Sequence, residues 1–172
     1  MKAHASYPTL LEMFYRFEKE KANQVFLSEP IAGKPLAHTW EEAGFSIRKM
    51  AGALFALHLP AGSRIAIIGK NSAHWIMADL AVTMAGHVSV PIYPTVTAST
   101  LRQILTHSES QVLFVGKLDA IEPLQSGIPS NVRCIHFPHW AWSGCEHWNT
   151  FIENADAIMG DTIPDPQALS CI

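Results

Sequence analysis

The segment RIAIIGKNSAHWIMADLAVTMAGHVSVPIYPTVTASTLRQILTHSESQVLFV (64–115) alternates short apolar runs with longer, helix-like ones. The short runs are rich in β-branched residues and continuously apolar, which is typical of strands buried on both faces. With one further run downstream, the predicted strands are RIAIIG (64–69), HVSVPIY (87–93), QVLFV (111–115) and VRCIHF (132–137). Their starts lie 23, 24 and 21 residues apart, so each interval has room for one crossover helix. We therefore predict an α/β fold in three layers, with a mainly parallel sheet built from right-handed βαβ units.

Two of the crossover helices are well marked. SAHWIMADLAVTMAG (72–86) and ASTLRQILTHS (98–108) have helical periodicity, and Thr97 is placed to cap the second. The faces expected to be buried are Trp75, Ile76, Leu80, Thr83 and Met84 in the first helix, and Ala98, Leu101, Ile104 and Leu105 in the second. The third crossover, KLDAIEPLQSG (117–127), is weaker because Pro123 interrupts it.

Two capping boxes mark helices in the amino-terminal part. Thr9 is followed by Glu12 and Thr39 by Glu42, so in each pair the two side chains can satisfy each other's backbone N–H groups. The apolar faces expected to be buried are Leu10, Met13, Phe14 and Phe17 in the first helix, and Ala43, Ile47, Met50, Ala51, Leu54 and Leu57 in the second.

The remaining segments complete the expected organisation. QVFLSEP (24–30) and KPLAHTW (34–40) predict a short hairpin or paired edge strands. We expect the whole chain to form one subdomain. Residues 1–62 supply helices and edge strands, and residues 63–137 form a βαβαβ(α)β core. Residues 138–172 contain a Trp- and His-rich segment, a linker and an apolar ALSCI ending that reads as a truncated strand.

Composition excludes several classes of function. The 172 residues are 48% hydrophobic and 16% charged, and the net charge of −3 leaves no basic footprint for nucleic acid. Three cysteines without a secretory signal indicate a reducing compartment, and hence a cytoplasmic protein. No run approaches the roughly 18 apolar residues of a transmembrane segment.

Known nucleotide and nucleophile motifs are missing. The strand-turn-helix IAIIGKNSAHW (65–75) is where an α/β protein would bind a nucleotide, but Gly69 alone cannot make a dinucleotide or phosphate loop. An ordinary turn capped by Asn71 or Ser72 is the simpler interpretation. No G-x-S-x-G elbow occurs, and Cys134 inside a predicted strand is expected to act as a small apolar residue. We predict no catalytic residue in this chain.

The segment CIHFPHWAWSGCEHW (134–148) concentrates potential metal ligands. They are Cys134, His136, His139, Cys145 and His147. Their order, C-x-H-x2-H-x5-C-x-H, lacks the closely paired ligands of zinc knuckles, so spacing predicts no metal site. Its three tryptophans, Trp140, Trp142 and Trp148, are instead expected to cover an edge of the sheet.

Residues 62–117 closely resemble the amino-terminal part of the adenylate-forming enzymes, and among them the long-chain fatty acyl-CoA synthetases. The resembling features are the RIAI strand, Asn71 with Trp75 four residues later, Ala85-Gly86, VSVPIYPT (88–95), QILTHSESQVLFV (103–115) and, upstream, HTWEE (38–42). Tyr93 and Thr95 resemble the long-chain branch. The resemblance covers about Thr9 to Ile172, with Ser63 and His87 as departures from the usual residues.

The resemblance implies a two-step ligase. The fatty-acid carboxylate would attack the α-phosphate of ATP, giving acyl-adenylate and pyrophosphate, and the thiol of CoA would then displace AMP. In the family, a lead-in like DPQALSCI (165–172) runs into the loop that holds the ATP phosphates, and the ribose-binding aspartate, magnesium-binding glutamate and adenylating lysine follow. We therefore expect an N-terminal fragment that is inactive alone, in a protein that uses ATP, Mg²⁺ and CoA.

The same resemblance implies one binding contribution. The loop after the 87–93 strand and the end of the 111–115 strand correspond to places near the CoA nucleotide in related enzymes. Tyr93 would stack on it or hydrogen-bond to it, Thr95 would donate a hydroxyl, and Lys117 would meet a phosphate. A sheet with an unpaired edge is compatible with a homodimer. Membership of the long-chain class is compatible with a location at the inner face of a membrane.

Two rival interpretations come from other classes. A complete, non-catalytic binding module on the same scaffold would bind an acyl carrier, a CoA-like nucleotide or a protein, but the apolar ALSCI ending argues against it. A Rossmann-type NAD-binding domain would need the glycine fingerprint that is missing.

Overall fold

The computed structural model describes residues 7–120, 122–140, 142–163, 165 and 167–172. Ile121, Ala141, Pro164 and Pro166, which fall in the predicted third crossover, the Trp- and His-rich segment and the linker, lie outside the described residues. In chain order the elements are α1 (Leu10–Glu20), β1 (Val25–Ile31), β2 (Lys34–Thr39), α2 (Trp40–Phe55), β3 (Arg64–Ile68), α3 (Ala73–Met84), β4 (Val88–Ile92), α4 (Ala98–His107), β5 (Val112–Val115), α5 (Glu122–Gln125), β6 (Arg133–His136), β7 (Glu146–His147) and α6 (Trp148–Ile152).

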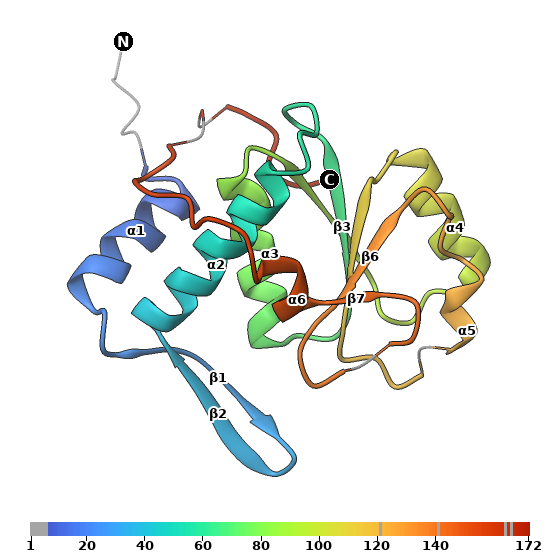
Figure 1. Ribbon diagram of the computed structural model, residues 1–172, viewed down its shortest axis with the longest axis horizontal. Coiled ribbons are helices and arrows are strands. Elements are labelled where there is room, and N and C mark those ends of the chain that lie inside the picture. Colours follow the sequence, from blue (N-terminus) through green and yellow to red (C-terminus); the bar gives the residue numbers. More distant parts are fainter. Residues whose placement is uncertain (1–6, 121, 141, 164, 166) are drawn as a thin grey trace.

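A five-stranded parallel sheet forms the middle layer, in the order β4-β3-β5-β6-β7. Figure 1 shows α1, α2 and α3 on one side of this sheet and α4 and α5 on the other. The three-layer α/β prediction and its four strands are therefore confirmed. β7, which pairs with the outer edge of β6, was not predicted.

The central strands are apolar on both faces because two separate cores need them. In β3, Ile65 and Ile67 face a first core shared with α1, α2, α3 and α6. Ala66 and Ile68 face a second core shared with α4 and α5. Successive side chains of a strand point to opposite faces, so the continuous apolar run is explained by helices on both sides.

Both predicted capping boxes are present, and they set the start of α1 and α2. The predicted face of α1 is confirmed at Phe14 but wrong at Leu10 and Met13. Leu11, Phe14 and Tyr15 are buried, whereas Leu10 is 63% exposed and Met13 is also exposed. Apolar residues occupy adjacent positions in this helix. Two of its faces, offset by one residue, are therefore apolar enough to be buried.

The buried surface of α3 includes the predicted Leu80 and Met84 but is wider than the predicted face. Ile76 is 37% exposed, while Ala73, Met77 and Ala81 are buried. α3 packs between α2 and the sheet and is therefore covered on two sides, which a single amphipathic stripe does not describe. Among the described residues, no helix is long and apolar enough to cross a membrane.

β1 and β2 form the expected hairpin, which projects from the body of the molecule in Figure 1. Ala32 and Gly33 make the turn with positive φ values of 49° and 78°, the conformation that tight hairpins need. At its base, Phe26 stacks on Trp40 with ring centroids 3.8 Å apart, and this joins the hairpin to the first core.

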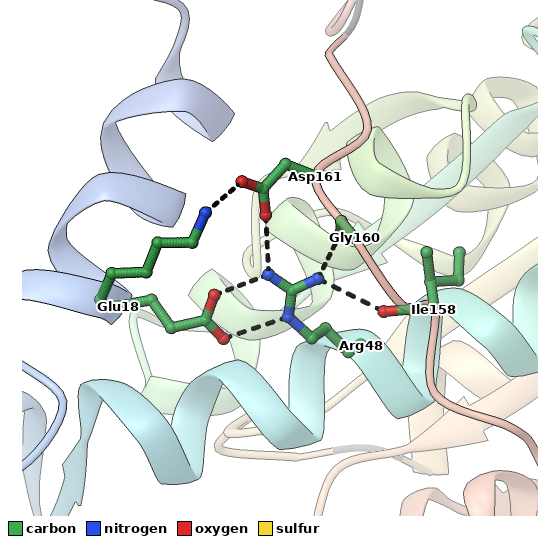
Figure 2. A network of polar contacts seen from close by, with 6 residues as sticks. Glu18, Arg48, Ile158, Gly160 and Asp161 are labelled. Atoms are coloured by element: carbon green, nitrogen blue, oxygen red, sulfur yellow. Dashed lines mark hydrogen bonds and ion pairs between the residues drawn. The ribbon is translucent and has the colours of Figure 1, made fainter.

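The segment after α6 returns across α1 and α2 to the free edge of β4. Figure 2 shows how Arg48 holds it: the guanidinium donates to Glu18, to Asp161 and to the carbonyls of Ile158 and Gly160. The segment ends beside β4, where a parallel bridge joins Ser89 and Cys171. This bridge agrees with the short terminal strand expected for ALSCI.

The Trp- and His-rich segment departs from its predictions. Cys134 is not simply a small apolar residue, because it forms a disulfide with Cys145. Nor do the tryptophans line one edge together: Trp148 is buried in the first core and Trp142 in the second. The sequence does not indicate this arrangement, because β7 is only two residues long. No apolar run therefore predicts that it pairs with β6.

Candidate ligand-binding edge of the sheet

The carboxyl ends of β3, β4 and β5 lie along one edge of the sheet because the strands are parallel. After β3 the chain passes outward to β4, and after β4 it crosses back to β5 on the other side of β3. Connections that leave in opposite directions create a topological switch point, where open α/β sheets bind ligands.

Two glycines bring the loops at this switch point into close contact. A Cβ on Gly69 would lie 2.0 Å from the carbonyl oxygen of Gly116, and one on Gly116 would lie 2.3 Å from Cδ2 of Phe137. The amide of Lys70 donates to the carbonyl of Lys117 across 3.1 Å. The backbone therefore fills the space between the ends of β3 and β5, and open space remains on the β4 side.

The amino end of α3 is occupied by a carboxylate of the protein itself. Glu29 comes from the hairpin and is only 6% exposed. Its Oε1 accepts a hydrogen bond from the amide of Ala73 at 3.1 Å, and its Oε2 lies 3.4 Å from Nζ of Lys117. Glu29 thus meets the positive end of the helix and the charge of Lys117 together.

Tyr93 and Lys117 both lie near the loop between β3 and α3 but make different contacts there. Tyr93 is 82% exposed and lines a pocket of about 300 Å³ together with Asn71 and Trp75. Lys117 does not line this pocket, but its Nζ donates to the carbonyl oxygen of Asn71 at 2.8 Å. Thr95 lies in the exposed turn beyond Tyr93 and is outside the pocket lining. The structure therefore groups Tyr93 with Asn71 and Trp75, and leaves Thr95 apart.

Glu29 is the residue of this edge that sequence reasoning missed. It stands between Ser28 and Pro30 in a strand expected at the periphery, and no motif signals that it reaches α3. The cap of α3 was half predicted: of the two candidates, Ser72 accepts from the amide of Trp75. Asn71 instead supplies a carbonyl to Lys117.

A buried histidine lies beneath the hairpin. His74, in the first turn of α3, packs edge-on against Trp148 and His38 with ring centroids 5.2 Å and 5.8 Å apart. Burial lowers the pKa of His74 to about 3, and positive charge on His38 and two further histidines adds to the effect. The imidazole is therefore neutral at physiological pH, and its ring packs against its aromatic neighbours.

Comparison of sequences places this architecture among known proteins. A model of the AMP-binding enzyme family matches residues 14–172. The long-chain-fatty-acid–CoA ligase FadD15 of Mycobacterium bovis is 34% identical over 102 residues, which are 59% of this chain and 17% of that protein. The human long-chain-fatty-acid–CoA ligase ACSBG2 is 26% identical over 175 residues, covering 95% of this chain and 25% of the relative. The chain thus spans a quarter or less of the length of these relatives.

Solved structures share the fold at low identity. A luciferase-like enzyme from the mealworm Zophobas morio matches with a TM-score of 0.79 and 11% identity, over 99% of this chain and 40% of that one. A benzoate CoA ligase from Burkholderia xenovorans matches with a TM-score of 0.76 and 17% identity, over 94% and 31%. The match to the family model, which covers nearly the whole sequence, shows that the chain belongs to the AMP-binding enzyme family.

Proposed function

We propose that this chain is the N-terminal subdomain of a ligase that joins a long-chain fatty acid to CoA through an acyl-adenylate. The observation that carries the proposal is the match to the AMP-binding family over residues 14–172. The named activity of FadD15 and ACSBG2, long-chain-fatty-acid–CoA ligases, supports the substrate class. The role of this chain is to hold the sheet and to present its carboxyl edge to the reacting groups.

CoA is the substrate whose contacts we assign to this edge. The exposed ring of Tyr93 beside a pocket of about 300 Å³ suits stacking with an adenine, and Thr95 would add a hydroxyl from the neighbouring turn. Lys117 fits a phosphate less directly, because its Nζ already contacts Asn71 and Glu29. A phosphate would have to compete with Glu29 for this ammonium group.

Within the part of the chain that the structure describes, this edge holds no group of three or more His, Cys, Asp and Glu side chains placed for Mg²⁺. The buried carboxylate here, Glu29, is taken up by Ala73 and Lys117, so it does not suit a magnesium ligand. When bound, Mg²⁺ would neutralise phosphate charge during adenylation. The residues described here supply packing and position for that chemistry, and we propose that the chain alone does not adenylate.

Pyrophosphate exchange tests the absence of adenylation. The purified chain is mixed with ATP, Mg²⁺, a long-chain fatty acid and labelled pyrophosphate, with heat-killed chain as the blank. We expect no fatty-acid-dependent label in ATP. Label above the blank would contradict the proposed scaffold role and show that this chain holds the adenylation site.

A titration calorimetry experiment tests the CoA contacts. We expect the chain to bind CoA weakly and Tyr93→Ala to bind it at least about 5-fold more weakly, since a base–aromatic stack contributes about 1–3 kcal/mol. Tyr7→Ala, which removes another highly exposed tyrosine, is the matched control and should bind like the wild type. Equal affinity of the two variants would contradict a role for Tyr93.

A further inference from the structure

Two Cys-x-His pairs lie in register on neighbouring strands at the β6–β7 edge. β6 and β7 are parallel, with Ile135 opposite Glu146 and His136 opposite His147. One step back along both strands, Cys134 comes opposite Cys145, and the disulfide between them, with Cα atoms 4.7 Å apart, agrees with this placement. The order C-x-H…C-x-H thus becomes two rows of like residues in space.

All four side chains belong to one face of the sheet. Cys134 and Cys145 pack against the second core. Ile135 and Trp148, their neighbours in alternation, belong to the first core on the opposite face. Because side chains alternate along a strand, His136 and His147 share the face of the cysteines. Their rings meet edge-on with centroids 4.8 Å apart.

The spacing of this array suits a small, soft cation. Neighbouring strands lie about 4.8 Å apart and residues i and i+2 about 6.7 Å apart, so the four Cβ atoms surround a central point above the sheet. Zinc takes two thiolates and two imidazoles in a tetrahedron, with bonds of about 2.3 Å to sulfur and about 2.1 Å to nitrogen. Rotation about the side-chain bonds is enough to bring such donors to one point.

A hydrogen bond orients one of the two histidines for metal binding. Nδ1 of His136 lies 3.1 Å from the carbonyl oxygen of Phe137, so the proton belongs on Nδ1 and the lone pair on Nε2. An imidazole held by a backbone carbonyl in this way is the usual support of a metal-binding histidine. His147 differs, because its Nδ1 accepts from the amide of Asn149 and caps α6. Binding a metal through Nε2 would move the proton to Nδ1 and release this cap.

We propose that reduction of the Cys134–Cys145 disulfide creates a Cys₂His₂ zinc site from Cys134, His136, Cys145 and His147. Two molecules of a thiol such as glutathione would reduce the disulfide to two cysteine thiols and leave as one glutathione disulfide. Zn²⁺ would then bind both sulfurs as thiolates and release two protons. With the disulfide formed, the described residues hold no group of three or more His, Cys, Asp and Glu side chains placed for a metal.

Spacing along the chain alone predicted no metal site at these residues. That prediction assumed ligands paired within one turn of chain, as in a knuckle. Here the pairing partner of each ligand lies 11 residues away and comes close through strand register. The site does not depend on ligase activity, since it lies at the β7 edge of the sheet and β4 forms the opposite edge.

Cobalt substitution tests the site on the intact chain. Disulfide-bonded and phosphine-reduced wild type are titrated with Co²⁺ without oxygen, and native mass spectrometry then counts bound Zn²⁺. We expect only the reduced form to bind an ion, one per chain. Its cobalt spectrum should show a thiolate-to-cobalt charge-transfer band and the strong visible bands of a tetrahedral centre. The comparison uses the wild-type sequence in both states, so no substitution can disturb the fold. No band in the reduced chain, or equal binding by the disulfide form, would overturn the proposal.

Variants then assign the ligands. Cys145→Ser should lose most of the charge-transfer intensity, and His136→Gln should weaken zinc binding by roughly 100-fold or more, since even supporting residues of a metal site contribute 10- to 100-fold. Cys171→Ser removes the free cysteine outside the array and is the matched control. If Cys171→Ser loses the band and Cys145→Ser keeps it, the assigned site is wrong.

Discussion

The two faces of the sheet are built differently. On the first face, α1, α2, α3 and α6 bury a continuous core that includes stacked aromatic rings. On the second, α4 and the short α5 cover a smaller core, and a disulfide fastens its outer edge. Figure 1 shows the same imbalance, with most helical segments on the side of α1 and α2.

The two faces also differ in the polar and sulfur-containing groups that they carry. The first face gains its stability from apolar area, and its buried histidine is kept neutral. The second face, with less to bury, carries the cysteines at the β6–β7 edge where the sheet is narrowest. The disulfide therefore lies on the face of the sheet that has the smaller core.

Truncating neighbouring residues of β5 tests the comparison most strongly. Phe114 and Leu113 are both fully buried but face the first and the second core respectively. We expect Phe114→Ala to lower the free energy of unfolding by about 3–5 kcal/mol, and Leu113→Ala to fall at the lower end of the about 2–5 kcal/mol typical of Leu→Ala, because its core is smaller. Urea unfolding measures both. An equal or larger loss for Leu113→Ala would break the claim that the first face dominates.

Reduction of the disulfide tests the second face. Opening the loop from Cys134 to Cys145 is expected to lower the free energy of unfolding by about 3 kcal/mol, because the reduced unfolded chain gains freedom. The measurement compares urea midpoints with and without reductant, in the presence of a chelator that removes metal. Cys171→Ser should show the same difference as the wild type. An unchanged midpoint would show that packing alone holds this edge.

Acid should weaken the first face through His74. Its folded pKa of about 3 lies below the unfolded value of 6.5, so the unfolded chain binds more protons between these values. Stability is therefore complete above about pH 6.5 and falls below it by about 1.4 kcal/mol per pH unit, or about 2 kcal/mol by pH 5. His74→Phe should flatten this part of the profile, whereas His107→Phe, at an exposed site, should not. An unaltered profile in His74→Phe would contradict the assignment.

Arg48 tests the polar fastening outside the first core. Arg48→Lys keeps the charge but loses the two-pronged contact with Glu18 and the bonds to two carbonyls, so we expect a loss of about 1–2 kcal/mol. Lys49→Arg is the matched control, since Lys49 contacts one exposed carbonyl and should change stability little. Protease cleavage within 156–161 should speed up in the first variant only. Equal cleavage of both would show that the segment is held by other contacts.

The smallest effect is expected at the carboxyl edge. Tyr93→Ala should change the free energy of unfolding by less than about 0.5 kcal/mol, because the side chain is mostly exposed. Tyr15→Ala, which empties a buried site of the first core, should cost several times more. A large loss for Tyr93→Ala in thermal unfolding would mean that this tyrosine is a packing residue.

Local signals in the sequence were sufficient for most of the scaffold. The boxes at Thr9 and Thr39 depend on residues three positions apart, and they formed as expected. β3, β4 and β5 were recognisable because both of their faces are largely buried, so no period had to be resolved. These features depend on near neighbours in the chain.

The features that escaped prediction all depend on distant partners. The buried face of α1 is chosen by what it packs against, since its sequence offers two. Cys134 and Cys145 come together only through the register of β6 and β7. Of the three residues assigned to CoA, Tyr93 has a pocket beside it and Lys117 already has partners, and neither fact is visible in the sequence. Their role stays a prediction.

Glu29 has a consequence for any anion that approaches α3. The hairpin delivers this carboxylate to the helix terminus as part of the same chain, so its effective concentration there is on the order of millimolar or above. A phosphate or carboxylate ligand must outcompete that tethered group before it can use the amide of Ala73. The hairpin thus blocks anion binding at this end of α3 with its own carboxylate. The pocket beside Tyr93 is therefore the more accessible place for a ligand.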